Sequence, residues 1–171
     1  GVSRPTVRSA LGRLAGEGLV VLEPHRGARV NMLVAEQLHD LFQLRTALEV
    51  EAARIALAER PEELDRALAE ANTALTAACR ARRVQWRRVG EAHEVVHRAL
   101  VDSAQSPRIS AAHMGLAAEL RLFVVALMPR WTAKEMVEHH EQLRRELRED
   151  GPEAVRRHLA AGEHAVAGAP G

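Results

Sequence analysis

The feature that most constrains the fold is a long stretch of helical sequence that begins at Ala35 and continues almost to the C-terminus. No pattern typical of a strand interrupts it, and breakers divide it at Pro61, near Val84, at Ser106-Pro107, at Pro129-Arg130 and at Gly151-Pro152. Connections this short place consecutive helices side by side in opposite directions. The sequence therefore predicts an all-α antiparallel bundle of six helices, near residues 35–59, 62–82, 85–104, 107–128, 132–149 and 152–165.

The composition narrows the class of protein. Of the 171 residues, 47% are hydrophobic, which is enough to bury a core, but only 2% are aromatic, which excludes nucleic-acid readers that stack bases on aromatic rings. The single cysteine, Cys79, excludes a disulfide framework and a zinc site built from cysteines. The longest apolar run, Leu122 to Met128, is too short to span a membrane, and no signal peptide is evident. We therefore expect a cytoplasmic protein.

Basic charge is concentrated at the front of the chain. Residues 1–33 carry five arginines against two glutamates, which makes this stretch +3 and leaves −2 for the rest of a chain whose total is +1. Ser3 is a good N-cap, and apolar residues then recur at helical spacing, so we expect a helix from about Arg4 to Glu17. Short extended runs and a turn within residues 19–30 predict a two-stranded ribbon. Because so short a segment cannot form its own core, we expect further helices ahead of Gly1.

This front segment resembles the recognition helix and wing of the GntR family of bacterial transcription regulators. The resemblance lies in Ser-Arg-Pro-Thr-Val-Arg, Leu-Ala-Gly-Glu-Gly-Leu-Val and Pro-His-Arg-Gly-Ala-Arg-Val, which fall in register over the first 30 residues. It implies a partial winged helix-turn-helix in which Arg4, Thr6 and Arg8 contact operator DNA, while Arg26 and Gly27 form the wing tip. Arginine suits this role because it pairs bidentately with guanine.

Two reservations accompany the DNA contacts. The alternative interpretation is that five arginines on a short segment make an ordinary solvated face. In addition, the resemblance places the first residue of the chain in the turn before the recognition helix. We therefore expect this chain by itself to bind DNA poorly.

The helical stretch resembles a second module, the FCD ligand-sensing domain of FadR-type GntR regulators. Three motifs carry this resemblance: Leu-Arg-Thr-Ala-Leu-Glu-Val-Glu-Ala-Ala-Arg from residue 44, His-Glu-Val-Val-His-Arg-Ala-Leu from residue 93, and His-His-Glu-Gln-Leu from residue 139. We therefore expect a partial DNA-binding domain at residues 1–33 and an effector-binding domain at residues 34–171. The short linker, residues 31–34, would couple the two mechanically.

Histidines carry the candidate chemistry of the bundle. His93 and His97 are four residues apart, so they share one helical face and can hold a metal ion at two adjacent positions. The resemblance implies that His140 is the third ligand, with its neighbour His139 as a less favoured alternate. The alternative is that the pair is merely a surface or capped pair of histidines.

The fourth ligand departs from the family pattern. The position of the family's last-helix histidine falls on Gly162, which cannot ligate, and we prefer His158, one turn earlier, to His164. His93 stands where the family most often has aspartate. A site this rich in nitrogen favours Zn²⁺ or Ni²⁺ over Mn²⁺.

By the same resemblance, a metal in this setting does not imply catalysis. In the family the ion is structural or anchors the carboxylate of a small effector, and Arg45 and Arg121 are our candidates for binding that carboxylate. The alternative for each is a surface ion pair, and Arg45 has Glu49 in place one turn later. The remaining histidines, His25, His39 and His113, show no partner pattern, and we expect them to be structural.

The sequence thus predicts a bacterial transcription regulator rather than an enzyme, with no catalytic residues. A small carboxylate would shift the bundle between two arrangements and change the spacing of paired DNA-binding units in a homodimer. One alternative is a metal-dependent enzyme, for which Glu94-Val-Val-His97 supplies half of a di-metal carboxylate site but Glu138 lies at the wrong spacing for the other half. Another is a metal-binding dimerisation module without a DNA function.

Overall fold

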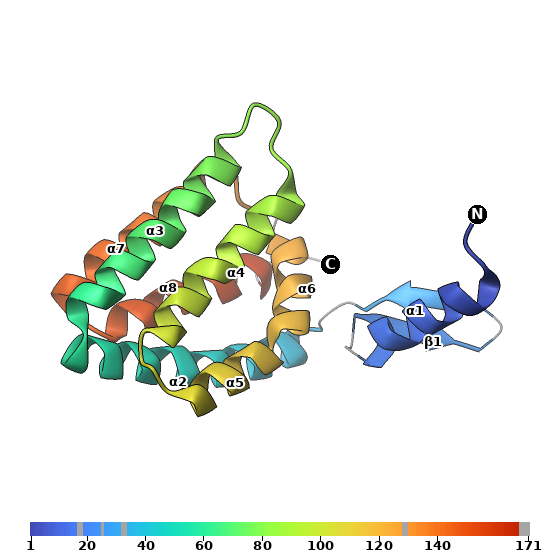
Figure 1. Cartoon of the computed structure of the whole chain (residues 1–171), viewed down its shortest axis with the longest axis horizontal. Coiled ribbons are helices and arrows are strands. Elements are labelled where there is room, and N and C mark those ends of the chain that lie inside the picture. Colours follow the sequence, from blue (N-terminus) through green and yellow to red (C-terminus); the bar gives the residue numbers. More distant parts are fainter. Residues whose placement is uncertain (17–18, 25, 32–33, 128–129, 168–171) are drawn as a thin grey trace.

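A computed structural model describes residues 1–16, 19–24, 26–31, 34–127 and 130–167. In Figure 1 the chain forms a small N-terminal unit, made of one helix and a two-stranded ribbon, and a larger body of helices. The predicted fold class, a helix and hairpin followed by a helical bundle, is confirmed. No helix in these ranges is long and apolar enough to cross a lipid bilayer.

The N-terminal unit begins with α1 (Arg4–Gly16), which starts where Ser3 was expected to cap it. The Ser3 hydroxyl accepts a hydrogen bond from the backbone N–H of Thr6 at 3.3 Å. Strands β1 (Val20–Glu23) and β2 (Gly27–Val30) pair in antiparallel register, with Val20 opposite Val30. The turn between them ends at Gly27, whose φ of 92° suits glycine. No residue of α1 is buried, so this unit has little core of its own.

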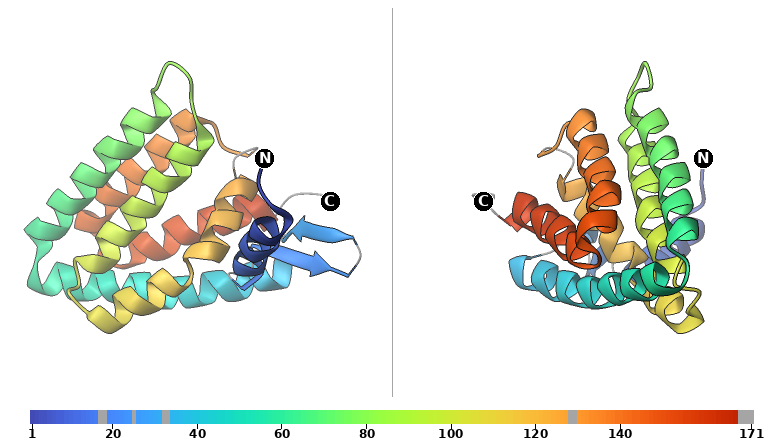
Figure 2. Two further views of the ribbon diagram at one scale, coloured as in Figure 1. Left: turned by 45° about the vertical axis from the view of Figure 1, so that its right-hand side comes forward. Right: turned by 90° about the vertical axis from the view of Figure 1, so that its left-hand side faces the viewer.

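The body contains helices α2 (Ala35–Glu59), α3 (Pro61–Cys79), α4 (Trp86–Asp102), α5 (Pro107–Gly115), α6 (Ala117–Leu127), α7 (Ala133–Asp150) and α8 (Glu153–Ala167). Helix α3 packs against α4 and against α7. Helix α2 contacts α8 and α4. Figure 2 shows α2 running beneath the steeply inclined α3, α4 and α7. The centre of the body is therefore lined by α2, α4, α7 and α8.

The predicted helix over residues 107–128 is wrong in one respect, because the chain forms two helices there. Helix α5 ends at Gly115, and the backbone N–H of Leu116 turns back to the carbonyl of His113 at 3.0 Å before α6 begins. Glycine weakens a helix at this point, whereas the apolar periodicity continues across it and conceals the break. The other predicted helices agree with the structure to within a few residues. Several predicted features lie outside the described residues: Glu17 at the end of the first helix, residues 32–33 of the linker, the breaker Pro129 and His25.

The core consists mainly of leucine, valine and alanine, as the low aromatic content requires. Phe42 and Phe123 meet edge to face at its centre, with ring centroids 4.8 Å apart. Two charged side chains interrupt the buried stripe of α2, where Arg45 and Glu49 lie between Phe42 and Ala52 at helical spacing and are 2% and 0% exposed. Buried charges are costly unless they are paired, so these two residues mark the interior site.

Candidate metal centre

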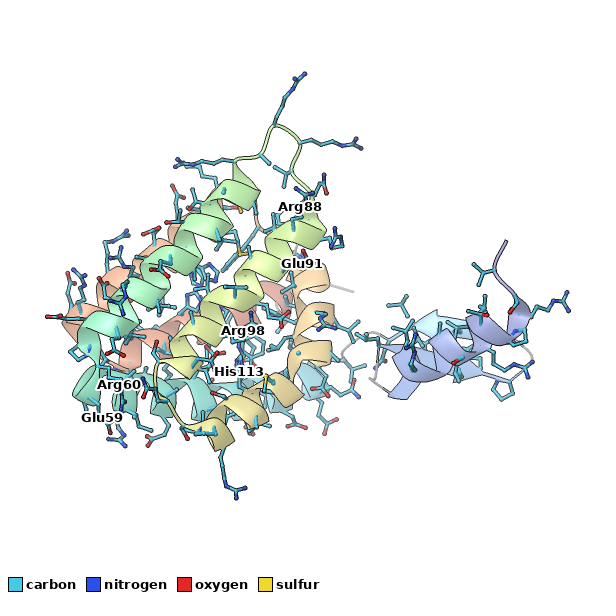
Figure 3. The ribbon with its side chains drawn as sticks, in the orientation of Figure 1. Glu59, Arg60, Arg88, Glu91, Arg98 and His113 are labelled. Carbon is cyan, nitrogen blue, oxygen red and sulfur yellow. The ribbon has the colours of Figure 1, made fainter. Side chains whose placement is uncertain are left out.

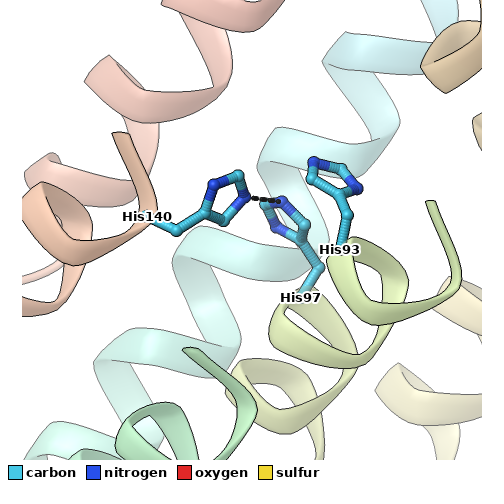
Figure 4. Close-up of side chains that lie close together, drawn as sticks. All are labelled: His93, His97 and His140. Atoms are coloured by element: carbon cyan, nitrogen blue, oxygen red, sulfur yellow. Dashed lines mark hydrogen bonds between the residues drawn. The ribbon is translucent and has the colours of Figure 1, made fainter. Parts of the chain in front are cut away.

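Four histidines meet at the centre of the helical body. His93 and His97 lie on the buried face of α4, His140 comes from α7, and His158 comes from α8. All four are buried, and the nearest ring nitrogens of His93, His97 and His140 lie within 4.8 Å of one another. Figure 4 shows the rings of these three side chains gathered between α4 and α7. The structure therefore brings together the four residues that the sequence singled out.

The hydrogen bonds made by the Nδ1 atoms of His97 and His140 determine the tautomers of these two rings. Nδ1 of His97 lies 2.8 Å from Oε2 of Glu49, and Nδ1 of His140 lies 2.7 Å from the carbonyl oxygen of Met136. A carboxylate and a carbonyl accept hydrogen bonds, so each Nδ1 carries a proton and donates it. In the neutral rings both Nε2 atoms are then bare acceptors.

The two bare Nε2 atoms face each other at 3.4 Å, along the dashed line in Figure 4. Two lone pairs at this separation repel unless a positive charge lies between them. Tetrahedral Zn²⁺ with bonds of about 2.1 Å to nitrogen places two ligand atoms about 3.4 Å apart. The spacing thus fits two ligands of one tetrahedral ion.

His158 provides a further observation in favour of a metal. Its Nδ1 is buried and has no hydrogen-bond partner among the described residues, and its ring centroid lies 4.7 Å from that of His140 and 5.3 Å from that of His97. A buried nitrogen without a partner is unusual in a folded protein. His158 is nevertheless outside the group of ring nitrogens that lie within 4.8 Å of one another, which consists of His93, His97 and His140. These three side chains therefore fit a metal ion, and His158 lies beside them.

The surroundings keep the imidazoles neutral, which is the form that binds a metal. Burial, followed by the positive charge of Arg45, lowers the pKa of His97 to about 4. Burial likewise lowers the pKa of His93, His140 and His158 well below the usual value for histidine. At neutral pH the centre therefore presents uncharged nitrogen ligands.

The carboxylate of Glu49 lies directly behind the centre. It accepts hydrogen bonds from Arg45 Nε at 2.6 Å, His97 Nδ1 at 2.8 Å and His113 Nε2 at 3.1 Å. Burial alone would raise the pKa of Glu49, but Arg45 and the two imidazoles hold it well below its usual value. Sequence reasoning noted Glu49 only as a partner for Arg45 and missed its contacts with the two histidines. The signal was available, because both charges occupy the apolar stripe of α2.

A cavity of about 580 Å³ opens beside the centre, between α4 and α6. Trp86, Leu120 and Val124 form much of its wall, and His93 and His97 also line it. Arg121, predicted to bind an effector, lines this cavity with its side chain 58% exposed, 3.9 Å from Glu94. The cavity is therefore open to a ligand that reaches the imidazoles.

Arg45, the other predicted effector ligand, does not line this cavity. Its guanidinium forms an ion pair with Glu49 inside the core, because the helix places the two side chains one turn apart on the buried face. The alternative for Arg45 was a surface ion pair with Glu49. The pair with Glu49 is present, but it is buried rather than on the surface.

The remaining histidines occupy several environments. His139 stacks on His158 with ring centroids 4.0 Å apart. Its Nε2 donates a hydrogen bond to the His158 carbonyl at 3.2 Å, so this nitrogen is not available as a metal ligand. His164 is exposed and donates to the Ala160 carbonyl. His39 pairs with Glu163 at the surface, at 3.0 Å. An α-carbon substituent at Gly162 would meet Phe123 at 3.5 Å, so that position packs against the core.

The predicted DNA contacts all lie on the surface. Arg4, Thr6 and Arg8 are exposed on α1, and Arg26 and Gly27 are exposed in the hairpin turn. Within the part of the chain that the structure describes, none of these three arginines forms an ion pair. Glu138, considered for a di-metal site, has a 60% exposed side chain near Lys134. It therefore lies away from the imidazoles.

The metal-free protein is expected to lose stability as the pH falls from about 6.5 to about 4. In that window the unfolded chain binds protons that the buried imidazoles, with pKa values lowered in the folded state, do not take up. Thermal melting across this range tests the expectation. His158→Leu should flatten the dependence, and His164→Leu, at the surface, should not. Equal slopes in all three proteins would contradict it. The charged or titratable groups that surround these rings are Arg45, Glu49, His113 and His139.

Comparison with known proteins identifies both units of the chain. Residues 1–30 match the family of bacterial regulatory proteins named gntR, and residues 40–162 match the FCD domain. The Nta operon transcriptional regulator of Aminobacter aminovorans is 42% identical over 55 residues, which are 32% of this chain and 26% of that protein. This chain thus aligns with only about a quarter of that relative's length.

Solved structures agree with the fold. A GntR transcriptional regulator from Rhodococcus sp. RHA1 is 24% identical, with a TM-score of 0.74 over 99% of this chain and 83% of its own. A GntR family member from Pseudomonas syringae pv. tomato is 27% identical, with a TM-score of 0.59 over 98% of this chain and 71% of its own. The description of this family, bacterial regulatory proteins, agrees with the prediction of a regulator rather than an enzyme. The chain belongs to the GntR family of bacterial regulatory proteins and carries an FCD domain.

Proposed function

We propose that this chain is part of a transcription regulator whose helical body senses a small carboxylate through a bound divalent metal ion. The observation that carries the proposal is the pair of bare Nε2 atoms of His97 and His140, 3.4 Å apart in a buried centre. His93, His97 and His140 would hold the ion and leave its fourth position to the carboxylate, with His158 as the fourth ligand when no carboxylate is bound. Nitrogen ligands and tetrahedral spacing favour Zn²⁺, with Ni²⁺ next and Mn²⁺ last.

The bound ion would supply a positive charge at the floor of the cavity between α4 and α6. A carboxylate entering this cavity would meet that charge at one end, and its apolar part would contact Trp86 and Val124. Arg121 stands at the wall and would bind a second acidic group or the same carboxylate. Arg121 Nε lies 3.9 Å from the Glu94 carboxylate, which is a long and weak ion pair. A ligand that binds Arg121 would therefore lose little by replacing Glu94 as its partner.

The N-terminal unit is proposed to read operator DNA. Arg4, Thr6 and Arg8 share the exposed start of α1, and the hairpin turn presents Arg26 beside Gly27. This arrangement suits a helix that enters the major groove and a wing that contacts the adjacent backbone. We propose that the functional units are residues 1–33 and 34–171, and that the regulator acts as a homodimer on two half-sites.

Zinc binding tests the metal centre. Titration calorimetry on the metal-free protein should show one Zn²⁺ per chain, with Ni²⁺ weaker and Mn²⁺ weakest. His93→Leu and His140→Leu should each weaken Zn²⁺ binding by about a hundredfold or more, because each removes a ligand. His164→Leu is the control and should bind as the wild type does. Zinc affinity that is unchanged in both ligand variants would exclude this centre.

Thermal shift tests the effector. Small carboxylic acids that bind should raise the melting temperature, and the rise should be larger with Zn²⁺ present because the ion supplies the anchoring charge. Arg121→Ala should weaken the best acid about tenfold, since a charge-assisted hydrogen bond is lost. Arg98→Ala removes an exposed arginine of α4 outside the cavity, labelled in Figure 3, and should have no effect. An equal loss in both variants would argue against a role for Arg121.

The salt dependence of DNA binding tests the N-terminal unit. Fluorescence anisotropy on a short duplex, beginning at low salt, should give a linear fall of log affinity with log salt. Arg4→Ala and Arg8→Ala should each reduce the slope by about one if the side chain contacts a phosphate, or weaken sequence preference if it contacts a base. Arg108→Ala, exposed on α5, should change neither. If all three behaved alike, α1 would not be the DNA-reading helix.

A further inference from the structure

The two carboxylate oxygens of Glu49 accept hydrogen bonds from different partners. Oε1 accepts from Arg45 Nε at 2.6 Å and from His113 Nε2 at 3.1 Å, whereas Oε2, among the residues that the structure describes, accepts only from His97 Nδ1, at 2.8 Å. The side chain is 0% exposed, so water does not compete for these contacts. One oxygen is thus anchored to α2 and α5, and the other is reserved for the ring of His97 on α4.

We propose that Glu49 is the positioning residue of the metal centre, holding His97 in the Nδ1–H tautomer so that its Nε2 lone pair faces the site. The proposal rests on the proposed metal function. A carboxylate can only accept hydrogen bonds, so the proton of neutral His97 must stay on Nδ1. The same contact fixes the plane of the ring and makes Nε2 a stronger donor to a metal.

Within the described residues, the other three imidazoles of the centre have no carboxylate partner of this kind. His140 donates its Nδ1 proton to a backbone carbonyl of its own helix, and Nδ1 of His158 has no partner within the described ranges. No hydrogen bond from a ring nitrogen of His93 to a side chain is present in that part of the chain either. His97 is therefore the ligand whose orientation is imposed by an anion from another helix.

The energetics also favour a positioning role. A buried ion pair such as Arg45 and Glu49 contributes little net stability, because the desolvation of two charges offsets their attraction. Apolar residues of similar volume could replace the ion pair itself at little cost, but the buried N–H groups of His97 and His113 would lose their acceptor. What apolar residues cannot supply is the acceptor for His97 Nδ1.

The test uses a paired substitution that leaves no buried charge alone. In Arg45→Leu/Glu49→Leu, His97 Nδ1 loses its acceptor, and the proton should shift toward Nε2, where the bare Nε2 of His140 can accept it. Nitrogen–proton correlation NMR of the ring, on metal-free protein, reports this tautomer directly. We expect Nδ1–H in the wild type and a substantial Nε2–H population in the double variant, together with Zn²⁺ affinity lower by about 10–100-fold.

Two further variants separate positioning from a general loss of structure. Arg45→Leu/Glu49→Gln keeps a neutral acceptor in place and should restore the Nδ1–H tautomer and part of the affinity. Asp65→Leu/Arg144→Leu removes another ion pair, at 2.8 Å between α3 and α7, and should alter neither readout.

The outcomes are distinct. A wild-type protein that binds no Zn²⁺ would overturn the metal centre itself, and this role with it. Zinc binding of equal strength in the wild type and the Leu/Leu variant, or Nε2–H in the wild type, would overturn the positioning role alone and leave the metal centre standing. An equal loss of affinity in the Asp65→Leu/Arg144→Leu control would also overturn it.

Discussion

The interior of the helical body is organised by one buried carboxylate. An isolated anion could not be placed there, so Glu49 requires Arg45 one turn before it and imidazole donors from α4 and α5. The buried pair of Arg45 and Glu49 thus connects α2 to α4 and α5 through directional hydrogen bonds.

The four histidines of the metal centre lie next to Glu49 and, unlike it, are uncharged. Their environment disfavours positive charge, since burial lowers the pKa of every one of the four. The uncharged Nε2 atoms of His97 and His140, 3.4 Å apart, are poorly arranged without a ligand and well arranged for a metal ion. The cavity between α4 and α6 gives such an ion access to solutes.

The two parts of the chain use charge in different ways. The arginines of the N-terminal unit lie on the surface, where they would attract the DNA proposed as their partner and gain from counterion release. In the helical body, by contrast, Arg45 and Glu49 are buried and paired, and Glu49 accepts directional hydrogen bonds. This division suits a regulator, in which one part binds DNA by electrostatic contact and another discriminates among small ligands.

Much of this protein followed from local pattern in the sequence. Helical spacing of apolar residues located the elements, and the four-residue interval between His93 and His97 placed them on one face, because both rules depend only on the backbone geometry of a helix. The family motifs pointed to His140 and, less directly, to His158. The break at Leu116 escaped notice, since it depends on how α5 and α6 pack rather than on their periodicity.

Only the tertiary structure decided which side chains meet. The apolar stripe of α2 indicated that Arg45 and Glu49 could be buried, but their partners depend on which side chains α4 and α5 place over that stretch of α2. His113 showed no pattern along the chain because its partner Glu49 lies 64 residues away. The sequence determined the faces of the helices, whereas contacts between distant helices decided that Arg45 serves Glu49, that Arg121 lines the cavity, and that Glu49 supports His97.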